Sequence, residues 1–120
     1  MVDVKIILSI IWIAVMLCYL LGDVLRIFAG DFTPGEIEGK PMTQTVVFGM
    51  AIIMVIPIVM VVLSLILAYP INNWVNIIVA ILFIVFNLIG MKGMKVYDKF
   101  LIIVSFGLNV LTVWYAWNWL

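Results

Sequence analysis

Residues 41–91 read PMTQTVVFGMAIIMVIPIVMVVLSLILAYPINNWVNIIVAILFIVFNLIGM and contain no Asp, Glu, Lys or Arg. A short segment at 69–73, with one proline and two asparagines, divides this stretch into two apolar runs. Each run is long enough to cross a hydrocarbon core about 30 Å thick. Backbone groups that face lipid must be hydrogen-bonded within their own segment, which favours helices. The stretch therefore predicts a membrane-embedded helical hairpin, with helices over 43–69 and 73–91.

The charges that flank this hairpin delimit two further apolar spans, over residues 5–28 and 97–120. Only 10% of the 120 residues are charged and 68% are hydrophobic, whereas a soluble domain carries roughly 25% charged residues. Short links favour antiparallel neighbours. We predict an all-α membrane protein, a single transmembrane domain over 1–120 with four transmembrane helices in an up-down-up-down bundle. Pro57 lies near the middle of the second helix, where its missing donor predicts a kink.

The connections between these spans differ in length. Segment 69–73 is expected to form a tight turn, with Asn72 and Asn73 ahead of the third helix. The first connection, 29–42, is longer. Within it, Thr33-Pro34-Gly35-Glu36 has the form of a capping box with proline at the first helical position. This pattern predicts a single interfacial helical turn, and an irregular polar loop fits equally well.

The distribution of positive charge predicts the orientation in a cell membrane, because loops rich in Lys and Arg stay in the cytoplasm. The first and third loops share one side with Arg26, Lys40, Lys92, Lys95 and Lys99, and the other side has only Lys5. We therefore expect loops 29–42 and 92–96 in the cytoplasm and both termini outside. The N-terminus lacks the features of a cleaved signal peptide, so the first span is expected to be retained.

Large aromatic side chains gather near the predicted outer ends of the helices: Tyr69, Trp74, Trp114, Trp117 and Trp119. Such clustering is typical of a belt at the level of the lipid headgroups. A ligand cage built from the tryptophans is the alternative.

Composition argues against several classes of function. The formal net charge is zero, there is no histidine, and Cys18 is the single cysteine. We expect no nucleic-acid partner, no metal site, no intrachain disulfide and no cofactor. No catalytic motif is present. Asp98, at the start of the fourth span, is counted with the charged stretch 92–99 of the third loop. Asp23 is then the one acid inside the spans, without a partner carboxylate for general acid–base work. We therefore do not expect an enzyme.

Polar residues inside the spans are the candidate site residues. On the first helix, a stripe with spacings of three and four ends in Asp23 and Arg26 and should face the bundle. This charged pair predicts either a gate or ion site, or a juxtamembrane salt bridge. Asn87 on the third helix, and Asn109 with Ser105 and Thr112 on the fourth, predict either hydrogen-bonded helix packing or a polar path.

Small residues at positions 14, 18 and 22 recur at a spacing of four on another face of the first helix. Small side chains at this spacing allow helices to approach closely. Cys18 is therefore interpreted as a packing residue.

Three segments, GDVLRI at 22–27, IPIVMVVLS at 56–64 and YDKFLIIVSFGLNVLTVWYAW at 97–117, resemble a group of uncharacterised four-helix prokaryotic membrane proteins. That group is loosely similar to the DoxX-like small membrane proteins. The resemblance spans nearly the whole chain and implies a four-helix fold in the cell membrane. It brings no activity and no catalytic residue.

The sequence thus predicts a small multi-pass integral membrane protein of unknown activity that acts as an oligomeric or accessory membrane subunit. Its expected partners are the lipid bilayer and either further copies of the chain or other membrane subunits. Two alternatives remain. One is a small transporter or channel with a polar path near Asn87 and Asn109, and the other is a quinone-linked enzyme subunit, which rests on the DoxX-like resemblance alone.

Overall fold

The computed structural model describes residues 3–37 and 39–120 and contains four long helices. In chain order the elements are α1 (Val4–Phe28), β1 (Glu36–Ile37), β2 (Lys40–Pro41), α2 (Gln44–Ile66), α3 (Ile71–Gly90) and α4 (Val96–Trp119). Each helix is long and apolar enough to span a membrane. Even α3, with 20 residues, extends about 30 Å at 1.5 Å per residue. The prediction of an all-helical protein with four membrane-length helices is confirmed.

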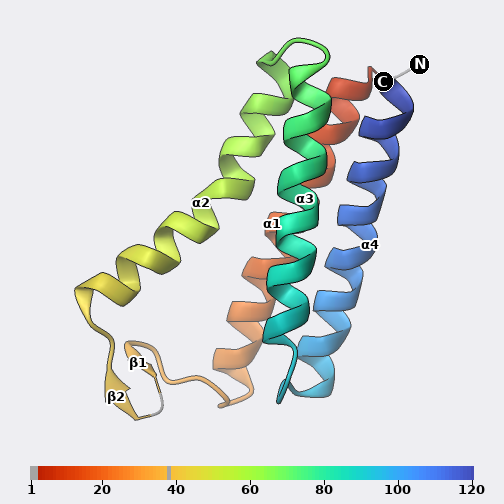
Figure 1. The fold of residues 1–120 in the computed structure, drawn as a ribbon. Coiled ribbons are helices and arrows are strands. Elements are labelled where there is room, and N and C mark those ends of the chain that lie inside the picture. The colour runs from red at the N-terminus through yellow and green to blue at the C-terminus, as the bar shows by residue number, and fades with distance from the viewer. Residues whose placement is uncertain (1–2, 38) are drawn as a thin grey trace.

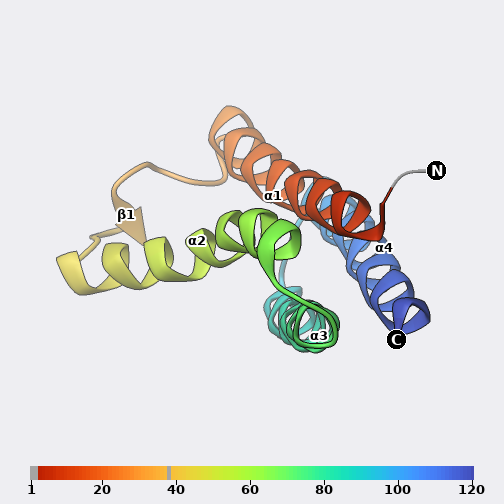
Figure 2. The same cartoon turned by 90° about the horizontal axis from the view of Figure 1, so that it is seen from above.

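The helices form a bundle with two distinct ends (Figure 1). The start of α1, the α2–α3 connection and the end of α4 lie together at what we call the terminal end. The β1–β2 hairpin and the α3–α4 connection lie at the opposite end, which we call the hairpin end. α1 packs along both α2 and α4, and α3 packs along α4, whereas α2 and α3 touch over a shorter length (Figure 2).

Helix ends differ from the predicted bounds most at the α2–α3 connection. α2 ends at Ile66 rather than at residue 69, and α3 begins at Ile71 rather than at 73. Asn72 and Asn73 therefore belong to the first turn of α3, where both are fully buried. The amide of Asn72 donates to the carbonyls of Ser64 (2.8 Å) and Leu67 (3.0 Å) at the end of α2. Their role is thus to bind carbonyls of neighbouring helix ends, since helix termini leave such groups free.

The first connection corrects another expectation. Residues 33–36 do not form a helical turn, and β1 pairs instead with β2 in a two-stranded antiparallel hairpin. Gly35 and Gly39 have φ angles of 84° and 79°, a left-handed conformation that glycine adopts without steric cost. The backbone of Gly35 also accepts a hydrogen bond from Met42 (2.9 Å). Glycines placed on both sides of β1 therefore favour a hairpin over a helix here.

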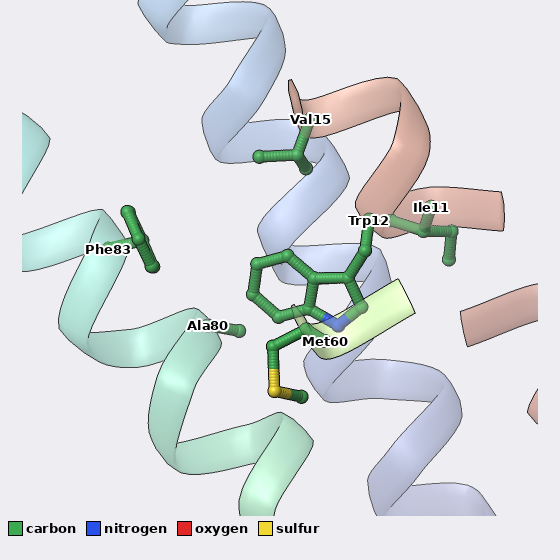
Figure 3. Packing of buried hydrophobic residues seen from close by; sticks show 6 residues of the cluster. All are labelled: Ile11, Trp12, Val15, Met60, Ala80 and Phe83. Atoms are coloured by element: carbon green, nitrogen blue, oxygen red, sulfur yellow. The ribbon is translucent and has the colours of Figure 1, made fainter. Parts of the chain in front are cut away.

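Trp12 occupies the centre of the apolar core. Its fully buried ring lies among Ala80 and Phe83 of α3 and Met60 of α2, with Val15 one turn further along α1 (Figure 3). The centroids of the Trp12 and Phe83 rings lie 6.2 Å apart in an edge-to-face arrangement, which is a favoured aromatic geometry. Residues of three helices therefore meet around one indole.

A buried hydrogen-bond network joins the same helices just beside this core. Trp12 Nε1 donates to Asn76 Oδ1 (2.7 Å), and Ser64 Oγ donates to the same oxygen (3.2 Å). Asn76 Nδ2 in turn donates to Asn72 Oδ1 (2.7 Å). We call Trp12, Ser64, Asn72 and Asn76 the asparagine network. It connects α1, α2 and α3, and the exposed surface of each of its four side chains is nearly zero.

The first half of α2 is much less embedded than the rest of the bundle. The buried residues of α2 are Pro57, Met60 and Ser64, and the earlier residues carry exposed apolar side chains such as Val47, Phe48 and Ile52. Figure 1 shows this part of α2 leaning away from α3 towards the hairpin end. The second half of α2 is therefore the half that anchors the helix to the bundle.

Replacing Trp12 by Phe should test the network, because it removes the indole N–H and keeps an aromatic ring in the core. We expect a loss of about 1 kcal/mol in the free energy of unfolding, in line with single hydrogen bonds between membrane helices. The measurement is denaturation of the purified protein in mixed detergent micelles. Trp114→Phe, at a half-exposed tryptophan, is the control. Equal stability of both variants would contradict the structural role of the network.

Candidate functional site

The four helices surround a cavity of about 170 Å³ towards the hairpin end of the bundle. Its apolar walls include Ile53 and Met54 of α2 and Phe83 and Phe86 of α3. Leu101 and Ile102 of α4 add to these walls, and the side chains with polar atoms are Cys18, Tyr19, Asp23 and Arg26 of α1, Asn87 of α3, and Asp98 of α4. We call it the polar cavity. A space of this size with several polar groups is large enough to hold water.

Arg26 is held between two carboxylates at the mouth of this cavity. Its guanidinium donates to Asp98 Oδ1 (2.7 Å) and also forms a short contact with Asp23 Oδ1. The two acids differ in environment, because the Asp98 side chain is 8% exposed and that of Asp23 is 50% exposed. A charged hydrogen bond to a buried carboxylate contributes more to stability than an exposed ion pair. The structure thus brings Asp23 and Arg26 together, as predicted, and adds Asp98 on another helix.

Gly22 lies beside this ion pair, where α4 packs on α1. A Cβ atom at this position would lie 3.6 Å from Asp98 Oδ1 and 3.7 Å from a terminal nitrogen of Arg26. Such distances are ordinary van der Waals contacts, so an alanine would also fit at this position. The small residue predicted to permit helix contact therefore lies directly beside the buried carboxylate.

Tyr19 and Asn87 meet across the cavity. Asn87 Nδ2 donates to Tyr19 Oη (2.8 Å) and to the Phe83 carbonyl (2.9 Å), and the Tyr19 ring stacks on Phe83 at a centroid distance of 5.9 Å. Within the described part of the chain, Asn87 Oδ1 accepts no hydrogen bond and the Tyr19 hydroxyl donates none. The amide oxygen of Asn87 is therefore an available acceptor in the lining of the cavity, whereas the Tyr19 hydroxyl lies near Asn109 and Ser105 of α4.

Asn109, Ser105 and Thr112 are all fully buried on the inner face of α4. Ser105 donates to the Ile102 carbonyl (2.6 Å) and Thr112 to the Leu108 carbonyl (3.2 Å), both within α4. Both hydroxyls thus donate to carbonyls of the preceding turn of their own helix, as serine and threonine in helices often do. Neither amide atom of Asn109 has a partner among residues 3–37 and 39–120. A buried amide without partners costs about 1–3 kcal/mol.

Asp98 is the site residue that sequence reasoning missed. It was counted with the charges of the third loop, although it lies in the first turn of α4. The buried residues of α4 are Asp98, Ile102, Ser105, Asn109, Thr112 and Ala116, with alternating spacings of four and three. Extending the Ser105–Asn109–Thr112 stripe two turns towards the N-terminus reaches Asp98. The signal was therefore present in the helical periodicity.

The aromatic residues predicted for the outer interface lie at the terminal end. Tyr69 pairs with Trp119 at a ring-centroid distance of 5.8 Å, and Trp74 pairs with Trp117 at 6.2 Å. Tyr69, Trp74 and Trp117 keep about half of their surface exposed. Rings that lie on the outside of the bundle in this way suit a headgroup-level belt.

Comparison with known proteins places the chain in one family. The sequence model of a family of unknown function, DUF6326, matches residues 2–120, which is nearly the full length. The match supports the prediction of an uncharacterised family and gives no link to the DoxX-like proteins. No curated protein and no solved structure matches the chain.

The unequal burial of the two acids makes a stability prediction. Asp98→Asn should lower the free energy of unfolding by about 1.5–3 kcal/mol, because the variant loses a charge-assisted hydrogen bond in a buried place. Asp23→Asn should lower it by less than about 1 kcal/mol, as expected for an exposed pair. Chemical denaturation of both variants in the same detergent provides the comparison. If the two variants lost equal stability, Asp98 would not be the principal partner of Arg26.

Proposed function

We propose that this chain, which belongs to the DUF6326 family, is a four-span protein of the cell membrane that binds a small ligand as an accessory subunit and does not act as an enzyme on its own. The observation that carries the proposal is the difference between the two ends of the bundle. The terminal half is closed by the core around Trp12 and by the asparagine network. The hairpin half contains the polar cavity, whose lining includes the Asn87 amide and three charged groups.

The proposed orientation has both termini outside and the hairpin end in the cytoplasm, in an up-down-up-down bundle with α2 kinked at Pro57. It is supported by the five Lys and Arg residues at the hairpin end and by the aromatic residues at the terminal end. In this orientation the polar cavity faces the cytoplasmic half of the bilayer. Its charged mouth then lies near the headgroup region, where Arg26 and Asp23 remain hydrated.

The shape of the site favours binding over catalysis. Intramembrane ionisable groups are costly and mark functional sites, and here they surround a space rather than a dry contact. The cavity carries two carboxylates, but one arginine lies between them and contacts both. Neither carboxylate is therefore presented as a free general base. A ligand with hydrogen-bond donors would meet Asp98, Asn87 and Tyr19.

We retain the proposal that copies of the chain, or other membrane subunits, associate with it. It is supported by the exposed apolar first half of α2, which has few partners within its own bundle. The quinone-linked alternative has no support beyond the DoxX-like resemblance.

A polar path through the membrane is the second candidate function, and Asn109 is the observation that favours it. Its amide is fully buried without hydrogen-bond partners among the described residues, and it lies near the Tyr19 hydroxyl together with Ser105. Such a group would be satisfied if water or a solute entered the bundle beyond Tyr19. The path would then continue from the polar cavity towards the terminal end, past the core around Trp12.

Cys18 provides a native reporter for the cavity, because it is the single cysteine and lines the cavity wall. In vesicles, we expect a small water-soluble methanethiosulfonate reagent to label Cys18, since a hydrated cavity admits the reagent. A membrane-impermeant reagent of the same class should label it from the cytoplasmic face only. Mass spectrometry of the protein measures the labelled fraction with time.

The control for this experiment is Leu17→Cys in a Cys18→Ser background. Leu17 is the neighbouring residue on α1 and is 59% exposed on the outer surface of the bundle, where it would face lipid and stay unlabelled. A labelling rate at Cys18 as low as that of the control would show that the cavity is dry, and the proposed function would fall. Labelling from the outer face would reverse the proposed orientation.

The path hypothesis predicts labelling beyond the cavity. Asn109→Cys, in a Cys18→Ser background, should react with the small reagent if water passes Tyr19, and Asn87→Cys should react under either function. Asn109→Leu should then abolish the passage of water or solute along this path while leaving the protein folded. If Asn109→Cys is unreactive and Asn109→Leu is well tolerated, the polar path is excluded. Ligand binding then remains as the proposed function.

A further inference from the structure

An apolar groove of about 410 Å³ runs along the outside of the bundle between α2 and α3. Its lining is entirely apolar and includes Ile56 of α2 and Leu82, Val85 and Ile89 of α3. The groove alone falls within the range of about 300–1,000 Å³ that is typical of small-molecule sites. We call it the α2–α3 groove.

The groove and the polar cavity are adjacent hollows that share part of their walls. Ile53, Phe83 and Phe86 line both of them. Its lining residues Leu82 and Ile89 are 61% and 75% exposed, so in a membrane the groove opens towards the hydrocarbon layer. A molecule in the groove would therefore be separated from the polar cavity by these shared side chains alone and not by the headgroup region.

The polar cavity favours a ligand group that is positively charged and donates hydrogen bonds. The ionisable groups that line it are Asp23, Arg26 and Asp98, which together carry one formal negative charge. Arg26 contacts only the Oδ1 atoms of the two acids, so each acid keeps its second oxygen as an acceptor, and Asn87 Oδ1 adds another. A primary ammonium has three N–H donors and would find both charge and hydrogen bonds here.

A second hollow adjoins the polar cavity on the cytoplasmic side and has the opposite charge balance. Arg26, Lys92 and Lys95 line it with Asp31 and Asp98, which leaves one formal positive charge. It shares Arg26, Met94 and Asp98 with the polar cavity. A negative group next to the ammonium would therefore meet lysine side chains.

We propose that the polar cavity and the α2–α3 groove form a single binding site for an aminophospholipid, which enters from the bilayer. The primary ammonium binds at Asp98 and Asn87, the phosphate lies towards Lys92 and Lys95, and one acyl chain occupies the groove. This proposal rests on the proposed function and names its ligand class. Lipids whose head carries a trimethylated nitrogen or a neutral glycerol lack the ammonium donors and should bind more weakly.

Protection of Cys18 tests the proposal, because the occupied cavity excludes the thiol reagent. The full-length protein is reconstituted in vesicles of phosphatidylcholine, or in vesicles with part of that lipid replaced by phosphatidylethanolamine or by phosphatidylglycerol. We expect phosphatidylethanolamine to slow Cys18 labelling about tenfold, the factor expected from one charge-assisted hydrogen bond. Phosphatidylglycerol should leave the rate within about twofold of that in phosphatidylcholine.

Two variants test the two ends of the site. Asp98→Asn should remove most of the protection by phosphatidylethanolamine. Leu82→Trp fills the groove at a residue that is 61% exposed, so it should fold normally and also abolish protection. Ile81→Trp is the matched control, since Ile81 neighbours Leu82 on α3, is 46% exposed and does not line the groove. This control should retain full protection.

The outcomes separate this inference from the proposed function. If Cys18 is labelled rapidly in phosphatidylcholine and phosphatidylethanolamine gives no protection, the hydrated cavity is supported. The proposal that it binds an aminophospholipid is then overturned. Equal protection by all added lipids would also overturn it, because no headgroup would be recognised. If soluble ethanolamine protected Cys18 as well as the lipid does, the acyl chain and the groove would have no role. The same conclusion would follow if Leu82→Trp and Ile81→Trp behaved alike. In either case the proposal of a single site made of cavity and groove would be wrong.

Discussion

Polar side chains inside a hydrocarbon layer need partners within the protein, because lipid tails neither donate nor accept hydrogen bonds. In the terminal half of this bundle, Asn76 is the residue that joins the largest number of these partners. Its amide oxygen accepts hydrogen bonds from Trp12 and Ser64, and its nitrogen donates to Asn72. Three helices are thereby fixed in register beside the core. The stability of the terminal half thus depends on one side chain that lies on the same helix face as Ala80 and Phe83.

In the hairpin half, fewer polar side-chain atoms have hydrogen-bond partners within the protein, and these atoms make this half suitable for binding a ligand. Asp98 has one oxygen bound to Arg26, Asn87 has its nitrogen bound to Tyr19, and the remaining atoms face a cavity. Only Pro57 and residues beyond it on α2 are buried against the other helices. Rigid packing in one half and free polar atoms in the other are the arrangement that a binding site on a stable scaffold requires.

Most of this architecture follows from the sequence by simple counting. Apolar runs between charges predict four helices, and the spacing of Asn76, Phe83 and Asn87 predicts their shared inner face. The partners were not predictable in the same way. That Asn87 meets Tyr19, or Arg26 meets Asp98, depends on which helices pack side by side, and helical periodicity contains no information on pairing.

Asn72 and Asn73 were assigned to a turn because asparagine is common there, whereas their buried hydrogen bonds to neighbouring carbonyls outweigh that preference. The hairpin at 36–41 was missed because proline and glutamate suggested a helix start, while the two glycines favoured a reversal of the chain.

The pairing of Arg26 with two acids has a consequence for the order in which the protein is made. Arg26 is synthesised 72 residues before Asp98, so its buried partner does not yet exist when α1 is inserted into the membrane. Asp23, three residues away, is the carboxylate that is available from the outset. α1 thus brings its own counter-charge to the bilayer, and the second contact forms when α4 arrives. The exposed ion pair, which adds little to the finished fold, therefore gives Arg26 a partner during the interval before α4 is made.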